Sequence, residues 1–241
     1  MIRADLHIHT VLSPCGDLEM TPLNIVKAAK SRGLDLIGIT DHNSTLNTLE
    51  IRRVGKRFGL AVLCGAEITT REEVHVLAFA EVDKLPALQA YLDEYIVRIP
   101  NNPDIFGYQL AVAENEEVTA QIDYLLINSI DRSVEEVGEF VKSLGGIFIP
   151  AHIDKHSNSI YSQLGFMPFG LSPDAAELSA SGSADEMRGR DKSLLKYNFI
   201  RSSDAHYLQD IGKVSTLLDT DDLTFDNIRK SIISKASPPQ I

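Results

Sequence analysis

The stretch Asp5-Leu-His-Ile-His-Thr10 places two histidines, two residues apart, at the end of a short apolar strand predicted from Ile2 to Ile8. Alternate side chains of a strand point to the same face, so His7 and His9 can enter one pocket together. Taken alone, the pair is equally compatible with a metal site, two core histidines or an exposed motif. It becomes informative because imidazoles recur at strand ends along the rest of the chain.

Four more histidines end or interrupt strand-like apolar runs, and these are His42, His75, His152 and His206. Two of them are preceded by an aspartate, in Asp41-His42 and in Asp204-Ala-His206. Such an aspartate can orient an imidazole from behind or cap the following turn. For His75, which lies between two valines, the alternative is a hydrogen-bonded core histidine.

Glu67 lies in the otherwise apolar segment Gly65-Ala-Glu-Ile68, where burial of a carboxylate is costly unless a cation accompanies it. With Asp204 and the six histidines it supplies enough nitrogen and oxygen donors for two or three divalent ions. This mixture of donors suits Zn²⁺, Mn²⁺ or Fe²⁺. A structural zinc knuckle is not expected, because the sequence has no Cys-x-x-Cys spacing.

Strand-like and helix-like segments alternate along most of the chain, which predicts βα units in a closed or nearly closed barrel. In such barrels the active site lies at the carboxyl ends of the strands, where the histidines fall. We expect one domain over residues 1–241, with a less regular segment at about 85–132 and a loose tail at 236–241. The predicted helices begin near Pro22, Ser44, Leu85, Val134, Asp185 and Thr224. The predicted strands are Ile2–Ile8, Asp35–Thr40, Ala61–Thr69, Glu73–Phe79, Gly146–Ile153, Ala175–Ser179, Asn198–Ser202 and Val214–Leu218.

The chain has 34 acidic and 23 basic residues and a net charge of -11. This balance disfavours general binding to a nucleic-acid backbone, which rewards clustered cations, so no nucleic-acid partner is expected. A small phosphorylated substrate stays compatible, because bound metal ions reverse the local sign of charge. No apolar run approaches the roughly 18 residues of a membrane span, and no signal peptide is visible. With only two cysteines, a reduced cytoplasmic location is expected, and oligomeric state is left open.

The ordered motifs resemble those of the PHP (polymerase and histidinol phosphatase) family of metal-dependent phosphoesterases. The motifs are Asp5-Leu-His-Ile-His-Thr10, Gly38-Ile-Thr-Asp-His-Asn43, Gly65-Ala-Glu67, Pro150-Ala-His152 and Ser203-Asp-Ala-His206. The resemblance implies a distorted seven-stranded (β/α)7 TIM-like barrel, a trinuclear metal site and phosphoester hydrolysis. By motif, the catalytic first ion would take His7, His9, Glu67 and Asp204. Glu67 would bridge to a second ion held by His75 and His152, and His42 and His206 would hold the third.

The third ion needs one more ligand, and here the chain departs from the family pattern. Members of the family commonly place a histidine or aspartate shortly after the first motif, whereas this chain reads Ser13-Pro-Cys-Gly-Asp17. We expect Asp17 to ligate, because a hard oxygen donor suits the site, with Cys15 as the alternative.

The expected chemistry is hydrolysis of a small phosphorylated metabolite by metal-activated hydroxide. Five cationic side chains near the motifs are candidates for clamping the phosphate, namely Lys155, His156, Arg188, Arg190 and Arg201. The alternative for His156 is an exposed loop position, and for the arginines of α-helical Arg188-Gly-Arg190 a solvated helix face.

Three rival functions fit the sequence less well than the phosphoesterase. An amidohydrolase-type enzyme would want a bridging lysine at a strand end, and no predicted strand ends in one. A metal-binding module without catalysis is disfavoured by the nearly complete ligand set. A nuclease or polymerase-proofreading role is disfavoured by the acidic charge.

Overall fold

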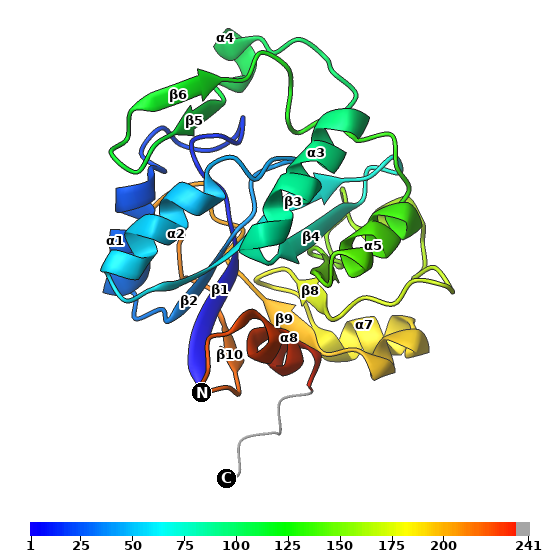
Figure 1. Ribbon diagram of the computed structural model, residues 1–241. Coiled ribbons are helices and arrows are strands. Elements are labelled where there is room, and N and C mark those ends of the chain that lie inside the picture. Colours follow the sequence, from blue (N-terminus) through cyan, green and yellow to red (C-terminus); the bar gives the residue numbers. More distant parts are fainter. Residues whose placement is uncertain (235–241) are drawn as a thin grey trace.

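A curled six-stranded sheet forms the centre of the computed structural model, which describes residues 1–234 (Figure 1). Strands β1, β2 and β3 are parallel neighbours, whereas β4 runs antiparallel to both β3 and β7, and β10 runs antiparallel to β1. In spatial order the strands are β10 (Thr216–Leu218), β1 (Ile2–Ile8), β2 (Leu36–Ile39), β3 (Ala61–Thr69), β4 (His75–Ala80) and β7 (Ile147–Pro150).

A separate parallel pair, β8 (Ala176–Leu178) and β9 (Phe199–Arg201), lies between the two ends of this sheet. Beyond β7, the Ile153 amide donates to the Glu177 carbonyl at 2.8 Å, and beyond β9 the Ala205 amide donates to the His7 carbonyl at 3.2 Å. The mixed α/β fold with a curled sheet is therefore confirmed. The finer prediction of a seven-stranded (β/α)7 barrel is not, because the main sheet of residues 1–234 has six strands.

Strands β3 and β4 follow each other without a helix between them, as their predicted ranges indicate, and they pair antiparallel. Only residues 70–74 separate these strands, which pair from Thr69 opposite His75 onward. A parallel crossover needs a dozen or more residues, so a connection this short can only form a hairpin. One consequence is that no helix follows β3 directly.

Within residues 1–234, six helices begin near the predicted positions, and two short ones, Pro103–Phe106 and Ile160–Gln163, were not predicted. The helix Val134–Ser143 begins with a capping box, in which Ser133 and Glu136 make both reciprocal hydrogen bonds. The second helix begins at Thr48 rather than Ser44, and in the segment before it the Thr45 amide donates to Gln89 Oε1. The helices are α1 (Pro22–Ser31), α2 (Thr48–Arg57), α3 (Leu85–Tyr95), α4 (Pro103–Phe106), α5 (Val134–Ser143), α6 (Ile160–Gln163), α7 (Ala184–Arg190) and α8 (Phe225–Ile233), with short 3-10 turns at Val82–Lys84 and Lys192–Lys196.

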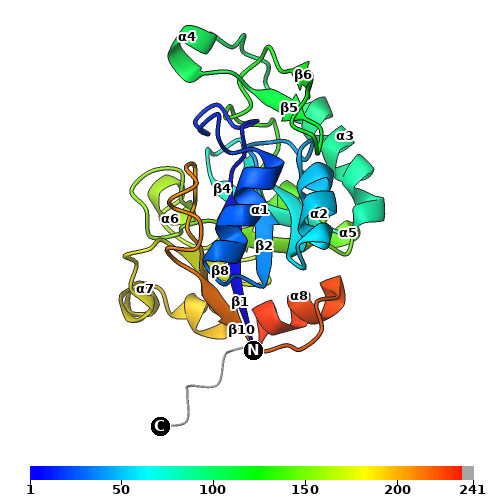
Figure 2. The ribbon, with the colours of Figure 1, turned by 90° about the vertical axis from the view of Figure 1, so that its left-hand side faces the viewer.

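The segment expected to be less regular contains α3, α4 and a small hairpin, β5 (Leu110–Val112) and β6 (Val118–Gln121). Figures 1 and 2 show α4 and this hairpin projecting beyond the end of the sheet where β1 finishes. Gln109 anchors the excursion, because its side chain bonds the backbone of Ile122, Tyr124 and Leu126.

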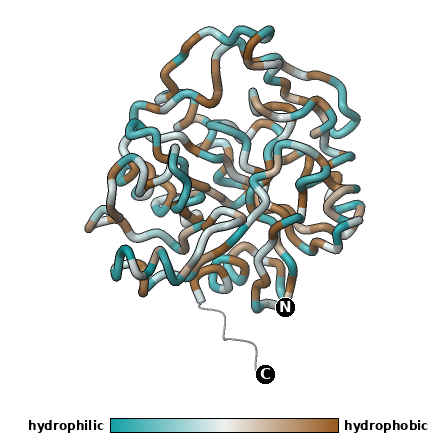
Figure 3. The backbone as a smooth tube through the Cα atoms, turned by 180° about the vertical axis from the view of Figure 1, so that it is seen from behind, coloured by the Kyte–Doolittle hydropathy of each residue, from teal (hydrophilic) through white to brown (hydrophobic). Residues whose placement is uncertain are grey.

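Apolar residues are buried on both faces of the sheet. One cluster packs the outer face against α1, α2, α3 and α5. The other fills the inside of the curl, where Leu36 and Leu63 meet Phe225 and Ile228 of α8. In Figure 3, short apolar and polar stretches alternate along the backbone tube. This alternation is expected of helices and strands that bury one side and expose the other. Helix α8 thus closes the end of the sheet opposite the α4 excursion (Figure 2). The tail predicted at 236–241 lies outside the described residues.

Candidate metal centre

Six histidines and two acids from distant parts of the chain meet at one edge of the curled sheet. Parallel strands bring their carboxyl ends to the same edge, and β4 joins it through its first residue because it runs the other way. The side chains are buried, except that Asp204 and His206 are partly exposed. His7 and His9 come from the end of β1, His42 follows β2, Glu67 lies in β3, His75 begins β4, His152 follows β7, and Asp204 and His206 follow β9.

Glu67 is the centre of the cluster. Its side chain is 1% exposed, and burial alone would raise the pKa of this carboxyl. The surrounding imidazoles, led by His75 and His7, instead hold the pKa of Glu67 well below its usual range. Five imidazole nitrogens lie within 3.4 Å of its two oxygens: those of His75 at 2.9 Å, His152 at 3.1 Å, His42 at 3.2 Å, His7 at 3.3 Å and His9 at 3.4 Å.

Three groups of donor atoms are close enough to share a cation, with all atoms of a group within 4.8 Å of one another. The first group lies inside the predicted first ligand set. The second group joins His42 of the predicted third set to Glu67 and His75. The third group joins His9 of the predicted first set to His42 and His206. The groups are His7, His9 and Asp204; His42, Glu67 and His75; and His9, His42 and His206.

The rings of His7 and His9 are oriented from behind by hydrogen-bonding partners at Nδ1. His7 Nδ1 lies 3.0 Å from Glu177 Oε2, and His9 Nδ1 lies 3.0 Å from Ser13 Oγ, which itself donates to Asp41. When Nδ1 of each ring donates its proton to these oxygens, Nε2 presents a lone pair to the cluster. Asp41 therefore holds Ser13 against the back of the His9 ring. Orienting an imidazole in this way is one of the two roles expected for this aspartate.

Glu177 was missed in the sequence, although the signal was there. It is a 2% exposed carboxylate in the apolar strand β8, the same feature that drew attention to Glu67. Its Oε2 contacts His7 and also accepts the His152 amide at 3.0 Å. Glu177 thus orients the His7 side chain of β1 and also holds the backbone of the turn at His152 after β7.

Protons are distributed unevenly over this cluster. Burial opposes protonation of His7, but the adjacent carboxylates of Glu177 and Asp204 outweigh it and raise the pKa of this imidazole well above its ordinary value. Burial and the neighbouring His206 lower the pKa of His9 to about 3. The neutral His9 ring is therefore ready to donate a lone pair, whereas His7 must first lose a proton.

The donor set fits divalent cations. Among residues 1–234, the buried atoms His75 Nε2 and His152 Nδ1 have no hydrogen-bond partner, and neither does Glu177 Oε1. Unpaired buried polar atoms are costly, and a cation with its bound water would give such atoms partners. His152 and Asp204 also have left-handed backbone conformations, with φ of 28° and 53°, which non-glycine residues seldom adopt away from functional sites.

Asp17, the residue expected to complete the third site, is not brought to the cluster. It lines a neighbouring cavity of about 530 Å³ with Phe106 and Tyr207, and its Oδ1 accepts the Glu19 amide at 2.8 Å. The alternative, Cys15, lines the cavity of about 180 Å³ that contains His42, Glu67 and His206. A tight turn causes the difference, because the Gly16 amide bonds the Ser13 carbonyl and turns Asp17 away.

The five candidate phosphate ligands divide into two sets. Lys155 lines the metal cavity and forms an ion pair with Asp204, and it borders a second cavity of about 420 Å³ together with His156 and Arg190. Arg201 instead donates to backbone carbonyls, including that of Ser179 at 3.0 Å, so it supports a loop. Arg188 lies over the Phe199 ring at 4.7 Å and does not border these cavities as far as residues 1–234 define them.

The sequence matches two family descriptions. Residues 5–119 match the PHP domain, and residues 193–236 match the PHP-associated segment. The chain belongs to the PHP family. The first range carries His7 to His75, and the second carries Asp204 and His206.

Three curated relatives match this PHP chain over 30 to 38% of its length. It is 40% identical over 79 residues to an uncharacterised protein of Methanocaldococcus jannaschii, covering 30% of this chain and 46% of the relative. It is 30% identical over 91 residues to a phosphoribosyl 1,2-cyclic phosphate 1,2-diphosphodiesterase of Eggerthella lenta, covering 36% and 34%. It is 32% identical over 95 residues to a 3',5'-nucleoside bisphosphate phosphatase of Chromobacterium violaceum, covering 38% and 32%. The matches span less than half the length of each relative.

Solved structures share the fold at low identity. A lesion-specific endonuclease of Pyrococcus furiosus superposes with a TM-score of 0.75 at 21% identity, covering 96% of this chain and 56% of the endonuclease. A candidate metal-dependent phosphoesterase of Bifidobacterium adolescentis superposes with a TM-score of 0.62 at 23% identity, covering 95% of each chain. Within residues 1–234, no helix combines the length and apolarity that a membrane crossing requires.

Proposed function

We propose that this PHP chain is a metal-dependent phosphoesterase. The observation that carries the proposal is Glu67, a single buried carboxylate within 3.4 Å of five imidazoles. We infer a site for two or three ions of Mn²⁺, Zn²⁺ or Fe²⁺, with Glu67 shared between them. When bound there, such ions supply an activated hydroxide and neutralise the oxygens of a phosphate.

The chain's own residues orient this site and receive the substrate. Glu177 and Ser13 fix the rings of His7 and His9. Lys155 lies at the junction of the metal cavity and its neighbour, where its ammonium can contact a phosphate oxygen while staying paired with Asp204. His156 and Arg190 line the far side of that second cavity, so they would contact a more distant part of the substrate.

A small phosphorylated metabolite is the substrate class we favour. The named activities of the Eggerthella and Chromobacterium relatives, on a cyclic sugar phosphate and a nucleoside bisphosphate, support it. The net charge of -11 argues in the same direction. A nucleic-acid ester is the second candidate substrate. It is supported by the Pyrococcus endonuclease, which resembles this chain in fold with a TM-score of 0.75.

The test incubates Mn²⁺-loaded protein with phosphomonoesters, a cyclic phosphate, a nucleoside bisphosphate and a DNA oligonucleotide. Free phosphate reports hydrolysis of the monoesters and the bisphosphate, and chromatography of the products reports opening of the cyclic phosphate and cleavage of the oligonucleotide. We expect turnover of at least one small ester, abolished by chelator and by Glu67→Gln. Exposed Glu139→Gln, which makes the same change on the surface of α5, is the matched control. Cleavage of the oligonucleotide alone would establish the second candidate, and no turnover by metal-loaded protein would contradict the proposal.

A further inference from the structure

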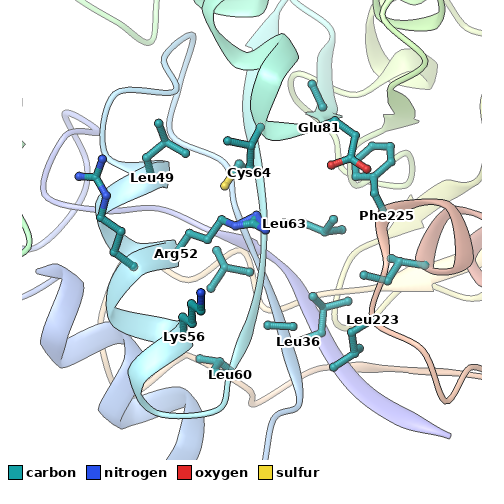
Figure 4. Close-up of a pocket in the computed structure, with 16 residues that line it drawn as sticks. Leu36, Leu49, Arg52, Lys56, Leu60, Leu63, Cys64, Glu81, Leu223 and Phe225 are labelled. Carbon is teal, nitrogen blue, oxygen red and sulfur yellow. The ribbon is translucent and has the colours of Figure 1, made fainter.

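A separate cavity, of about 540 Å³, opens at the end of the sheet away from the metal centre and from the cavities beside Lys155 (Figure 4). Its floor includes Leu36 and Ala61, which begin β2 and β3, whereas the metal ligands lie where those strands finish. Its walls come from α2 and α8. The β3–β4 hairpin explains the opening, because β3 is not followed by a helix that would cover this part of the sheet.

Two cations on one face of α2 point into this space. Arg52 and Lys56 are exposed, one helical turn apart, and within residues 1–234 neither has an ion pair or a side-chain hydrogen bond. Like charges four residues apart repel each other. Other cations of the same helix are neutralised, since Arg53 pairs with Glu50 and Arg57 with Glu114.

The opposite side of the cavity is apolar. Leu63 from β3 and Phe225 and Ile228 from α8 are nearly buried and line it. In Figure 4, Arg52 reaches from α2 toward Leu63, while Phe225 and Glu81 lie across the space. The carboxylate of Glu81 would repel an anion at that end, so an anionic group is favoured only beside α2.

We propose that this cavity binds a small amphipathic anion, with a carboxylate or phosphate head on Arg52 and Lys56 and an apolar body against Leu63 and Phe225. The volume lies within the range of about 300–1,000 Å³ usual for small-molecule sites. An apolar pocket with a few convergent polar groups is the arrangement such sites use. Nothing in the proposal depends on the metal centre.

The chain has no tryptophan, so one introduced into the cavity gives an isolated fluorescence signal. With Phe225→Trp as reporter and decanoate as probe, we expect saturable binding of one molecule per chain. Decylamine, which has the same tail and a positive head, should not saturate. Arg52→Gln with Lys56→Gln should weaken decanoate by about tenfold or more, the loss of about 1.4 kcal/mol. Arg57→Gln, which removes a charge from the same helix outside the cavity, should leave binding unchanged.

Calorimetry with the unmodified chain repeats the measurement without the reporter. The proposal is overturned if decanoate does not saturate there, if decylamine binds equally well, or if Arg57→Gln weakens binding as much as the double variant. His7→Ala must keep full decanoate affinity, and a loss would place the probe at the metal centre instead. Because these readouts are binding alone, they stand or fall separately from phosphoesterase activity.

Discussion

His7 and Glu177 lie 170 positions apart in the chain, yet His7 Nδ1 is 3.0 Å from Glu177 Oε2. Both groups are buried, and the contact joins β1 to β8 across the gap in the sheet. It fixes the ring so that Nε2 faces Glu67 and Asp204, at 3.3 and 3.4 Å. The geometry of the metal centre therefore depends on a carboxylate that touches no other proposed ligand side chain among the described residues.

We expect Glu177→Gln to lower metal affinity or turnover by about 10- to 100-fold, because partners behind a ligand typically carry that weight. The amide can still accept from His7 or donate to it, but it no longer favours the tautomer with Nε2 free. Metal titration and turnover should both be measured. Glu139→Gln provides the surface control, and an unchanged affinity and rate in Glu177→Gln would contradict the role.

Metal binding at neutral pH should release protons. The pKa of His7 is raised well above its ordinary value, so this ring carries a proton before a cation binds. A cation needs the Nε2 lone pair and must displace that proton, so affinity falls as pH falls. Calorimetric titration in buffers of different ionisation enthalpy measures the release. Binding with no proton release, or affinity rising on acidification, would show that His7 is neutral or does not ligate.

Asp17→Asn should leave metal content and activity unchanged, because this carboxylate lines a separate cavity and caps a turn. His206→Ala should remove one donor from the group with His9 and His42 and lower metal content. Mass spectrometry under native conditions compares the two variants. A loss of metal in Asp17→Asn equal to that in His206→Ala would restore Asp17 as a ligand.

Cation binding should stabilise the fold, because only the folded chain assembles this set of donors. At a free Mn²⁺ concentration 100 times the dissociation constant, the expected gain is about 2.7 kcal/mol of unfolding free energy. Chemical denaturation with and without chelator measures it. Glu67→Gln should lose most of the gain, and an equal gain in Glu67→Gln would mean that the ions bind elsewhere.

Much of the fold follows from local signals. The helix starts predicted near Pro22, Ser44 and Val134 lie within about four residues of the first residues of α1, α2 and α5. The hairpin from Thr69 to His75 was not predicted, because strand patterns carry no direction and only connection length reveals it. The ordered structure of the segment around α4 was not predicted for a different reason. It depends on Gln109, whose side chain bonds backbone groups that the sequence alone does not place near it.

The histidines, Glu67 and Asp204 were placed together because each ends or interrupts an apolar strand. The side chain of Asp17 lies apart from the other donors because of one turn at Gly16, a matter of backbone geometry within four residues that the sequence does not reveal. Arg201 bonds backbone carbonyls, and a sequence cannot distinguish a cation in that position from one that contacts substrate. Glu177 could have been found by applying to β8 the burial argument used for Glu67.

Metal content of the purified chain, equilibrated with excess Mn²⁺ or Zn²⁺ and freed of loose ions, tests the central claim most directly. The account predicts two or three tightly held ions in the unaltered protein and fewer in Glu67→Gln, with both folded. A folded, unaltered protein that retains none would contradict it.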